Sequence, residues 1–155
     1  MKNSIKLILA VLAGFAFTAC EEPDPFVDRV VSPVLVQLVG ENGAPSSGLS
    51  TDPTISSTFG ESTSFGIQVL ELDKTNILDY TKGIDSIPVT SLSLTIKYRG
   101  GGDISTLPTD GSGMAMVELP WSDFGITGAG ESVSLMVSGS YKDQSFSKLF
   151  KLASN

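Results

Sequence analysis

Residues 92–99 read LSLTIKYR, with an apolar or aromatic side chain at every second position. Successive side chains of a β-strand point to opposite faces of the sheet. The alternation therefore predicts a strand that buries Leu92, Leu94, Ile96 and Tyr98 and exposes the polar residues between them.

Similar alternation on both sides of this stretch predicts further strands. It is clear in residues 132–141, which place Val133, Leu135 and Val137 on one face, and in residues 64–72, which do the same with Phe65, Ile67 and Val69. It is weaker in residues 34–39, 54–59, 104–107, 114–119 and 146–152. Turn-forming stretches separate these segments, and only residues 75–82, ended by Gly83, have room for a turn or two of helix. About seven to eight short strands with almost no helix predict an all-β, antiparallel β-sandwich.

The first nineteen residues have the features of a cleaved signal peptide. Lys2 and Lys6 give a basic start, residues 7–17 form an apolar segment, and Ala19 supplies the small residue that a signal peptidase needs. Eleven residues of helix span only about 16 Å, which is too short to cross a membrane. Residues 1–19 are therefore predicted to be targeting sequence that precedes the fold.

Cys20, the only cysteine in the chain, follows this segment directly. The run Phe17-Thr18-Ala19-Cys20 resembles a bacterial lipobox, although Phe17 stands where leucine is usual. The resemblance implies that Cys20 is lipidated on its thiol and holds the mature protein on a membrane. An ordinary secretory signal followed by a cysteine is the alternative, but a single free thiol in an oxidising compartment invites cross-linking.

Residues 20–28 are predicted to be an extended spacer, because Glu21-Glu22-Pro23-Asp24-Pro25 has acids and prolines and no apolar periodicity. This run resembles the acidic stretch that follows the lipidated cysteine in some Gram-negative lipoproteins and directs them to the outer face. The implied location is the outer membrane, exposed at the surface, with the periplasmic face as the alternative. Loss of residues 1–19 removes two lysines and no acids, so the formal charge falls from −7 to −9. Such an acidic chain with no basic cluster is not expected to bind nucleic acid.

Residues 29–155 have the length of one domain. Within them residues 109–119 read TDGSGMAMVEL, which resembles the T-D-x-x-G-x-A-x-V-x-L stretch of bacterial Ig-like domains of the invasin type. Asp110 and Gly113 would form a tight turn, and Ala115, Val117 and Leu119 would point to one side of the strand that follows. The resemblance implies an Ig-like sandwich and a role in adhesion.

Catalysis is not expected, and no catalytic residue, metal ligand or cofactor is assigned. The chain has no histidine, which excludes the ordinary Ser-His and Cys-His nucleophiles and limits any metal site to oxygen ligands. Residues 145–148 match S-x-x-K, but a strand places Ser145 and Lys148 on opposite faces. The acids Glu61, Glu71, Asp73 and Asp79 could include a glycosidase pair, and solvated surface is the simpler interpretation.

Two features suggest ligands or modification. Trp121 follows a predicted strand, where it could act as a stacking platform for sugars, or could cap the core with its indole N–H bonded to a backbone carbonyl. Asp85-Ser86-Ile87 resembles a short O-glycosylation pattern of some Gram-negative envelope proteins, although about one such triplet is expected by chance.

The expected function is that of a non-catalytic, lipid-anchored envelope or surface module, acting in adhesion or as an accessory or assembly component with a protein or glycan partner. Two alternatives stay open. Exposed aromatic residues around Trp121 would indicate a carbohydrate-binding lipoprotein of a glycan uptake system. An apolar patch on a sandwich face, or an unprotected edge strand, would indicate a purely structural envelope subunit.

Overall fold

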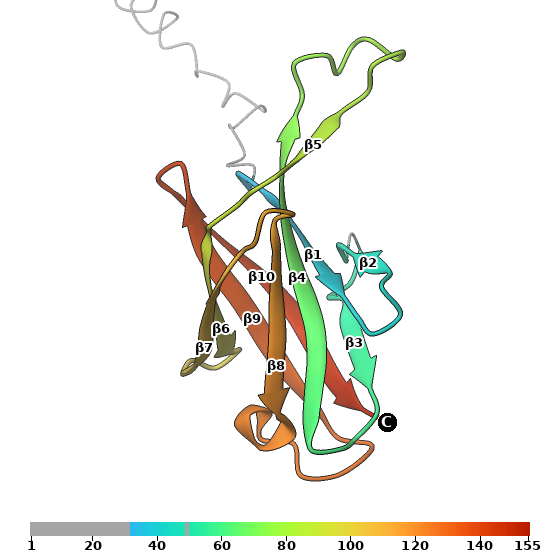
Figure 1. Cartoon of the computed structure of the whole chain (residues 1–155), viewed down its shortest axis with the longest axis vertical. Helices are drawn as coiled ribbons and strands as arrows, with labels where there is room; N and C mark the ends of the chain where they lie inside the picture. Colours follow the sequence, from blue (N-terminus) through green and yellow to red (C-terminus); the bar gives the residue numbers. More distant parts are fainter. Residues whose placement is uncertain (1–31, 49) are drawn as a thin grey trace, which may run out of the picture. The chain divides into compact units, whose positions relative to one another are not determined.

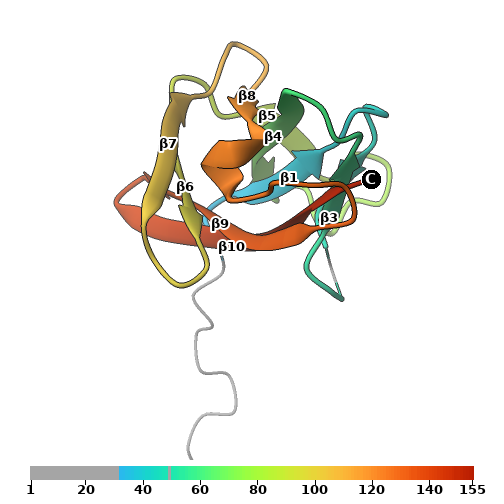
Figure 2. The ribbon, with the colours of Figure 1, turned by 90° about the horizontal axis from the view of Figure 1, so that it is seen from below.

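The computed structural model describes residues 32–48 and 50–155, in which two β-sheets face each other across one core (Figure 1). These residues belong to one compact unit, Ser32–Asn155. The predicted signal peptide, Cys20 and the acidic spacer lie outside the described residues. The view along the sandwich shows the two layers clearly (Figure 2).

The first sheet, sheet A, is organised around one long strand. It contains β1 (Leu35–Val39), β2 (Pro45–Ser46), β4 (Ser62–Asp73), β5 (Asp85–Pro88) and β8 (Met114–Pro120). The strand order is β2-β1-β4-β5, and β8 also pairs with β4. Along β4, residues 62–68 pair with β8, residues 66–70 with β1, and residues 70–73 with β5. The end of β4 therefore leaves the sandwich and has β5 as its only strand neighbour.

The second sheet, sheet B, has the order β3-β10-β9-β6-β7. Its strands are β3 (Thr54–Ser57), β6 (Ser93–Tyr98), β7 (Asp103–Pro108), β9 (Ser132–Tyr141) and β10 (Gln144–Ser154). All its pairs are antiparallel except β3 with β10, which run parallel. Strands β1, β4 and β8 lie in sheet A and strands β6, β9 and β10 in sheet B, which is how strands A, B, E and C, F, G are divided in an Ig-like sandwich.

The alternation in the sequence corresponds to the burial in the structure. Ile96, Leu135, Val137, Ile67 and Val69 are all fully buried between the sheets. Three other residues predicted to point inward are only partly buried against the same core: Leu92, Tyr98 and Val133. All eight predicted strands are present, and the predicted fold class is confirmed. The described residues contain ten strands, and the two that were not predicted, β2 and β5, are short and carry no alternation that would identify them.

The predicted turn before β8 is confirmed in detail. The Asp110 Oδ1 atom accepts hydrogen bonds from the backbone N–H of Ser112 at 2.8 Å and of Met114 at 2.9 Å. Gly113 has a φ of +73°, and a Cβ atom there would lie 2.6 Å from the carbonyl oxygen of Val69. Only glycine fits this position, because the turn packs directly against β4.

The possible helix over residues 75–82 is not formed. The segment is a series of turns between β4 and β5, with single backbone hydrogen bonds such as Ile77 N–H to Lys74 O at 3.0 Å. Asp73 and Asp79 accept hydrogen bonds from the N–H and hydroxyl groups of Thr75 and Thr81. These side-chain contacts stabilise turns in place of a helical hydrogen-bond ladder.

Candidate functional site: the hairpin of β4 and β5

The hairpin formed by residues 70–88 carries most of the large apolar side chains that the sandwich leaves exposed. Among the described residues, five of the six exposed large hydrophobic side chains lie on it. Leu78 is 97% exposed and Tyr80 is 96% exposed, which is close to full exposure. The other three are Ile77, Ile84 and Ile87. Single exposed apolar residues are ordinary on protein surfaces, but several on one hairpin make it a candidate interaction site.

The tip of the hairpin has a defined shape although it has no core of its own. The Asp79 carboxylate accepts hydrogen bonds from Thr81 N–H at 3.0 Å and from the Thr81 hydroxyl at 2.6 Å. The N–H groups of Lys82 and Gly83 both bond the carbonyl oxygen of Asp79, and Gly83 has a φ of +70°. Leu78 and Tyr80 flank Asp79, so these turns position the backbone from which both exposed side chains project.

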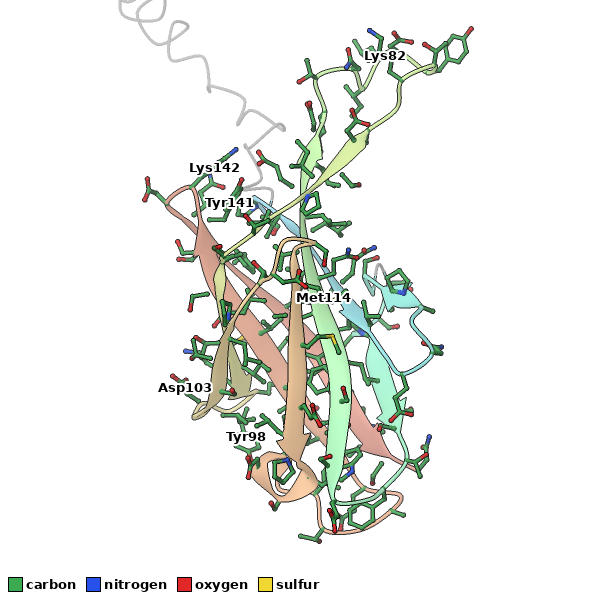
Figure 3. The ribbon with its side chains drawn as sticks, viewed as in Figure 1. Lys82, Tyr98, Asp103, Met114, Tyr141 and Lys142 are labelled. Atoms are coloured by element: carbon green, nitrogen blue, oxygen red, sulfur yellow. The ribbon has the colours of Figure 1, made fainter. Side chains whose placement is uncertain are left out.

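A polar clamp joins the base of the hairpin to the other sheet. The Tyr141 hydroxyl donates to Glu71 Oε2 at 2.6 Å, and the Lys142 ammonium group pairs with Glu71 Oε1. Tyr141 and Lys142 lie at the turn between β9 and β10, close to the base of the hairpin (Figure 3). Because Glu71 is on β4, the clamp connects sheet A with sheet B at the point where β4 leaves the sandwich.

Three acids of the hairpin, Glu71, Asp73 and Asp79, have pKa values that are lowered by hydrogen bonds to their carboxylates. The pKa of Glu71 is lowered by its hydrogen bonds from Lys142 and Tyr141, and the pKa of Asp73 by those from Thr75. The pKa of Asp79 is lowered mainly by the Thr81 hydroxyl, while the pKa of Tyr141 is raised by its bond to Glu71. A general acid near neutral pH needs a raised carboxyl pKa, so these shifts give no support to a glycosidase pair.

Trp121 lies at the opposite end of the sandwich, in the 3-10 helix η1 (Trp121–Phe124) that follows β8. Its side chain is 2% exposed and its ring lies 6.1 Å from that of Phe59, centroid to centroid. A stacking platform needs an open face, so Trp121 is a core residue in this structure and not a sugar platform. The expected hydrogen bond from its indole N–H to a backbone carbonyl is absent, because Nε1 is buried without a partner.

The remaining predicted positions are accounted for as follows. Ser145 and Lys148 lie on β10, so the S-x-x-K motif is in a strand and lacks the helix that its chemistry requires. Asp85, Ser86 and Ile87 lie exposed in β5, and their glycosylation stays a prediction. In the part of the chain that the structure describes, no three His, Cys, Asp or Glu residues are grouped closely enough to hold a metal ion.

A groove of about 420 Å³ beside β1, β2 and β3 is a weaker candidate site. Glu41 and Asn42 line it, but Glu41 accepts a hydrogen bond from Ser57 and Asn42 caps the backbone N–H of Ala44 at 3.0 Å. Both polar side chains are therefore used to hold the loop. The hairpin is the better candidate, because its exposed groups have no such structural role.

The comparisons with known proteins identify no relative. No protein-family model, curated protein or solved structure matches the chain. Across residues 32–48 and 50–155, no helix is long and apolar enough to cross a membrane.

Proposed function

We propose that this protein is a non-catalytic, lipid-anchored Ig-like module of a Gram-negative envelope, and that it works by binding. The anchor rests on the lipobox-like sequence ending at Cys20, and the outer-membrane location on the acidic run after it. The observation that carries the binding role is the group of exposed apolar side chains on the hairpin of β4 and β5. A module of this kind serves in adhesion or as an accessory or assembly component of a surface structure.

The carbohydrate-binding alternative has less support. It required exposed aromatic residues around Trp121, whereas Trp121 and its neighbour Phe124 are 2% and 1% exposed. The exposed aromatic side chain of the hairpin, Tyr80, stands among aliphatic residues and not in a row of rings.

A purely structural subunit remains the second candidate, because of one feature of sheet A. Gly66 pairs with Val39 of β1 on one side and with Met116 of β8 on the other. Because Gly66 has no side chain, the sulfur atom of Met114 occupies the space that a Cβ atom would need. Met116 is 59% exposed on the same outer face. An apolar strip of this kind could pack against a neighbouring subunit.

The anchor is tested by mass spectrometry of the mature N-terminus. We expect Cys20 to be the first residue and to carry lipid, and Cys20→Ala to leave unprocessed precursor or to release the protein from membranes. A mature chain that begins elsewhere, or an unmodified Cys20, would remove the anchor from the proposal.

The binding surface is tested by photo-crosslinking in intact cells. A photoreactive phenylalanine analogue replaces Leu78 on the hairpin, Met116 on the outer face of β8, or Glu118 as an exposed polar control on the same strand. Adducts with protein or with lipid from position 78, above the Glu118 background, are expected. Adducts from position 116 alone would favour the structural subunit, and background levels at both positions would contradict a binding role for either surface.

A further inference from the structure

The hairpin of β4 and β5 projects from the same end of the sandwich at which the described chain begins. Leu35, at the start of β1, pairs with Leu70 of β4, and Leu70 also pairs with Pro88 of β5. From Leu70 the hairpin continues through three more paired residues to Asp73 before its loop starts. At about 3.3 Å per residue, the loop therefore starts about 10 Å beyond the start of β1. Figure 1 shows this projection, with η1 at the opposite end.

The predicted anchor sets an upper limit on the distance of this end from the membrane. The chain from Cys20 to Ser32 covers twelve residues, which reach at most about 40 Å when extended. A bilayer that holds Cys20 is therefore within reach of the hairpin, and the hairpin tip is the part of the described unit that projects furthest from that end.

The chemistry of the tip suits the boundary between lipid headgroups and acyl chains. Leu78 and Ile77 offer aliphatic surface, and Tyr80 offers a ring with a polar end, which is the kind of side chain enriched at membrane interfaces. The tip backbone is in part satisfied internally, because the N–H groups of Ile77, Asp79 and Lys82 bond carbonyl oxygens within the loop. Internal hydrogen bonds of this kind lower the cost of moving a backbone out of water.

The charges of the hairpin favour uncharged lipid over anionic lipid. Residues 73–88 contain three aspartates and two lysines. Asp79, the acid nearest the exposed side chains, is hydrogen-bonded by Thr81 and lies 3.8 Å from the Lys82 ammonium group. With no basic cluster and an acidic chain overall, attraction to anionic headgroups is not available, so insertion would depend on apolar contact alone.

We infer that the tip formed by Ile77, Leu78 and Tyr80 inserts into the surface of the bilayer that carries the anchor. This inference rests on the proposed lipid anchor. It identifies the membrane as the binding partner of the hairpin, which the proposed function leaves open. Affinity need not be high. A short tether gives a second contact an effective concentration of about millimolar, so a weak contact is sufficient.

The test uses the full chain, produced with its own signal sequence and reconstituted in phosphatidylcholine vesicles whose acyl chains are brominated. Bromine quenches tryptophan that enters the acyl region. Wild-type protein gives the baseline, because Trp121 is the only tryptophan and is buried at the opposite end of the sandwich. Leu78→Trp places a reporter on the tip, and Met116→Trp places a matched reporter at an exposed apolar position of β8.

We expect the additional fluorescence of Leu78→Trp to be blue-shifted and quenched about two-fold or more, independently of salt, and that of Met116→Trp to be unchanged. Equal quenching at both positions would show the sandwich lying flat and would overturn insertion by the tip. No quenching at position 78, in protein whose Cys20 is lipidated by mass spectrometry, would overturn the inference and leave the anchor intact. Absence of the lipid itself would instead overturn the proposed function. Protein adducts from position 78 in cells, combined with no quenching in vesicles, would assign the tip to a protein partner.

Discussion

The two ends of β4 use the same kinds of side chain for opposite purposes. Between Phe65 and Val69 its inward residues are at most 1% exposed and pack between two sheets. Beyond Leu70 the strand pairs only with β5, and the apolar residues of the following loop face solvent. Between Phe65 and Val69 the structure is determined by burial. In the loop after β4 the structure is determined by turns, which side-chain hydrogen bonds stabilise. Stability is thus located in the first part of β4, and exposed apolar surface in the hairpin that follows it.

The largest effect is expected in the centre of the sandwich. Ile96 is fully buried on β6, so Ile96→Asp would place an unpaired charge in the core and cost about 5 kcal/mol or more. Because small domains are stable by only about 5 to 15 kcal/mol, we expect this variant to be largely unfolded in a thermal or urea melt. A variant that melts close to wild type would show that the register of β6 is wrong.

Trp121→Ala should have the next largest effect, at the end of the sandwich farthest from the hairpin. Removing a buried indole leaves a cavity and should cost about 3 to 4 kcal/mol in urea unfolding. Trp121→Phe is the matched control. It keeps an aromatic ring and removes an N–H that has no partner, so its loss should be clearly smaller. Equal losses would mean that the indole N–H does form a hydrogen bond.

A smaller effect is expected at Glu71, where the sandwich and the hairpin meet. Its pKa is lowered from the ordinary 4.5 by hydrogen bonds from Lys142 and Tyr141, so the folded state favours the ionised carboxylate. The stabilisation is therefore present above the unfolded-state pKa and is lost as the pH falls through the lower folded-state value. Urea unfolding of wild type between pH 7 and pH 3 should show this loss, and Glu71→Gln should remove part of it. An identical acid dependence in both proteins would argue against the clamp.

The smallest effect on stability is expected at the tip. Leu78 is 97% exposed, so Leu78→Asp should change the free energy of unfolding by no more than about 0.5 kcal/mol. Substitution by aspartate at Ile96 is expected to unfold the protein. Comparing the stability of Ile96→Asp with that of Leu78→Asp therefore measures the contrast between core and tip directly. A large loss of stability from Leu78→Asp would show that the tip packs against something within the folded unit.

The sequence predicted the sandwich well because alternation reports burial on a sheet directly. Ile96, Leu135 and Phe65 all lie inward as their positions in the pattern required. The turn at Asp110 and Gly113 was also predictable, since it depends on a local side-chain hydrogen bond and a positive φ. The burial of strand residues follows from a period of two residues, and the turn follows from residues that are neighbours in the sequence.

The candidate site was not predictable in the same way. Residues 75–82 were interpreted as a possible helical turn, and Leu78 and Tyr80 were not identified as exposed. Their exposure depends on β4 extending past the end of β1, which is a property of the pairing in space. The one available signal was the apolar run Ile77-Leu78 together with Tyr80, located between Asp-Lys-Thr-Asn and Thr-Lys-Gly turn formers and outside any alternating pattern. For Trp121 the sequence left two possibilities, an exposed sugar platform and a cap on the core, and the structure shows the ring buried in the core.

The parallel pair of β3 and β10 has a consequence for how the chain reaches its folded state during synthesis. Thr54 pairs with Lys151, 97 residues later, and Phe59 N–H bonds the carbonyl oxygen of Asn155 at 3.0 Å. Sheet B cannot close until the ribosome has released the residues of β10, because β3 has no other strand partner. Contacts of such long sequence separation also form slowly. The complete sandwich therefore forms only after residues 144–154 have been synthesised, although sheet A contains no strand that depends on β10.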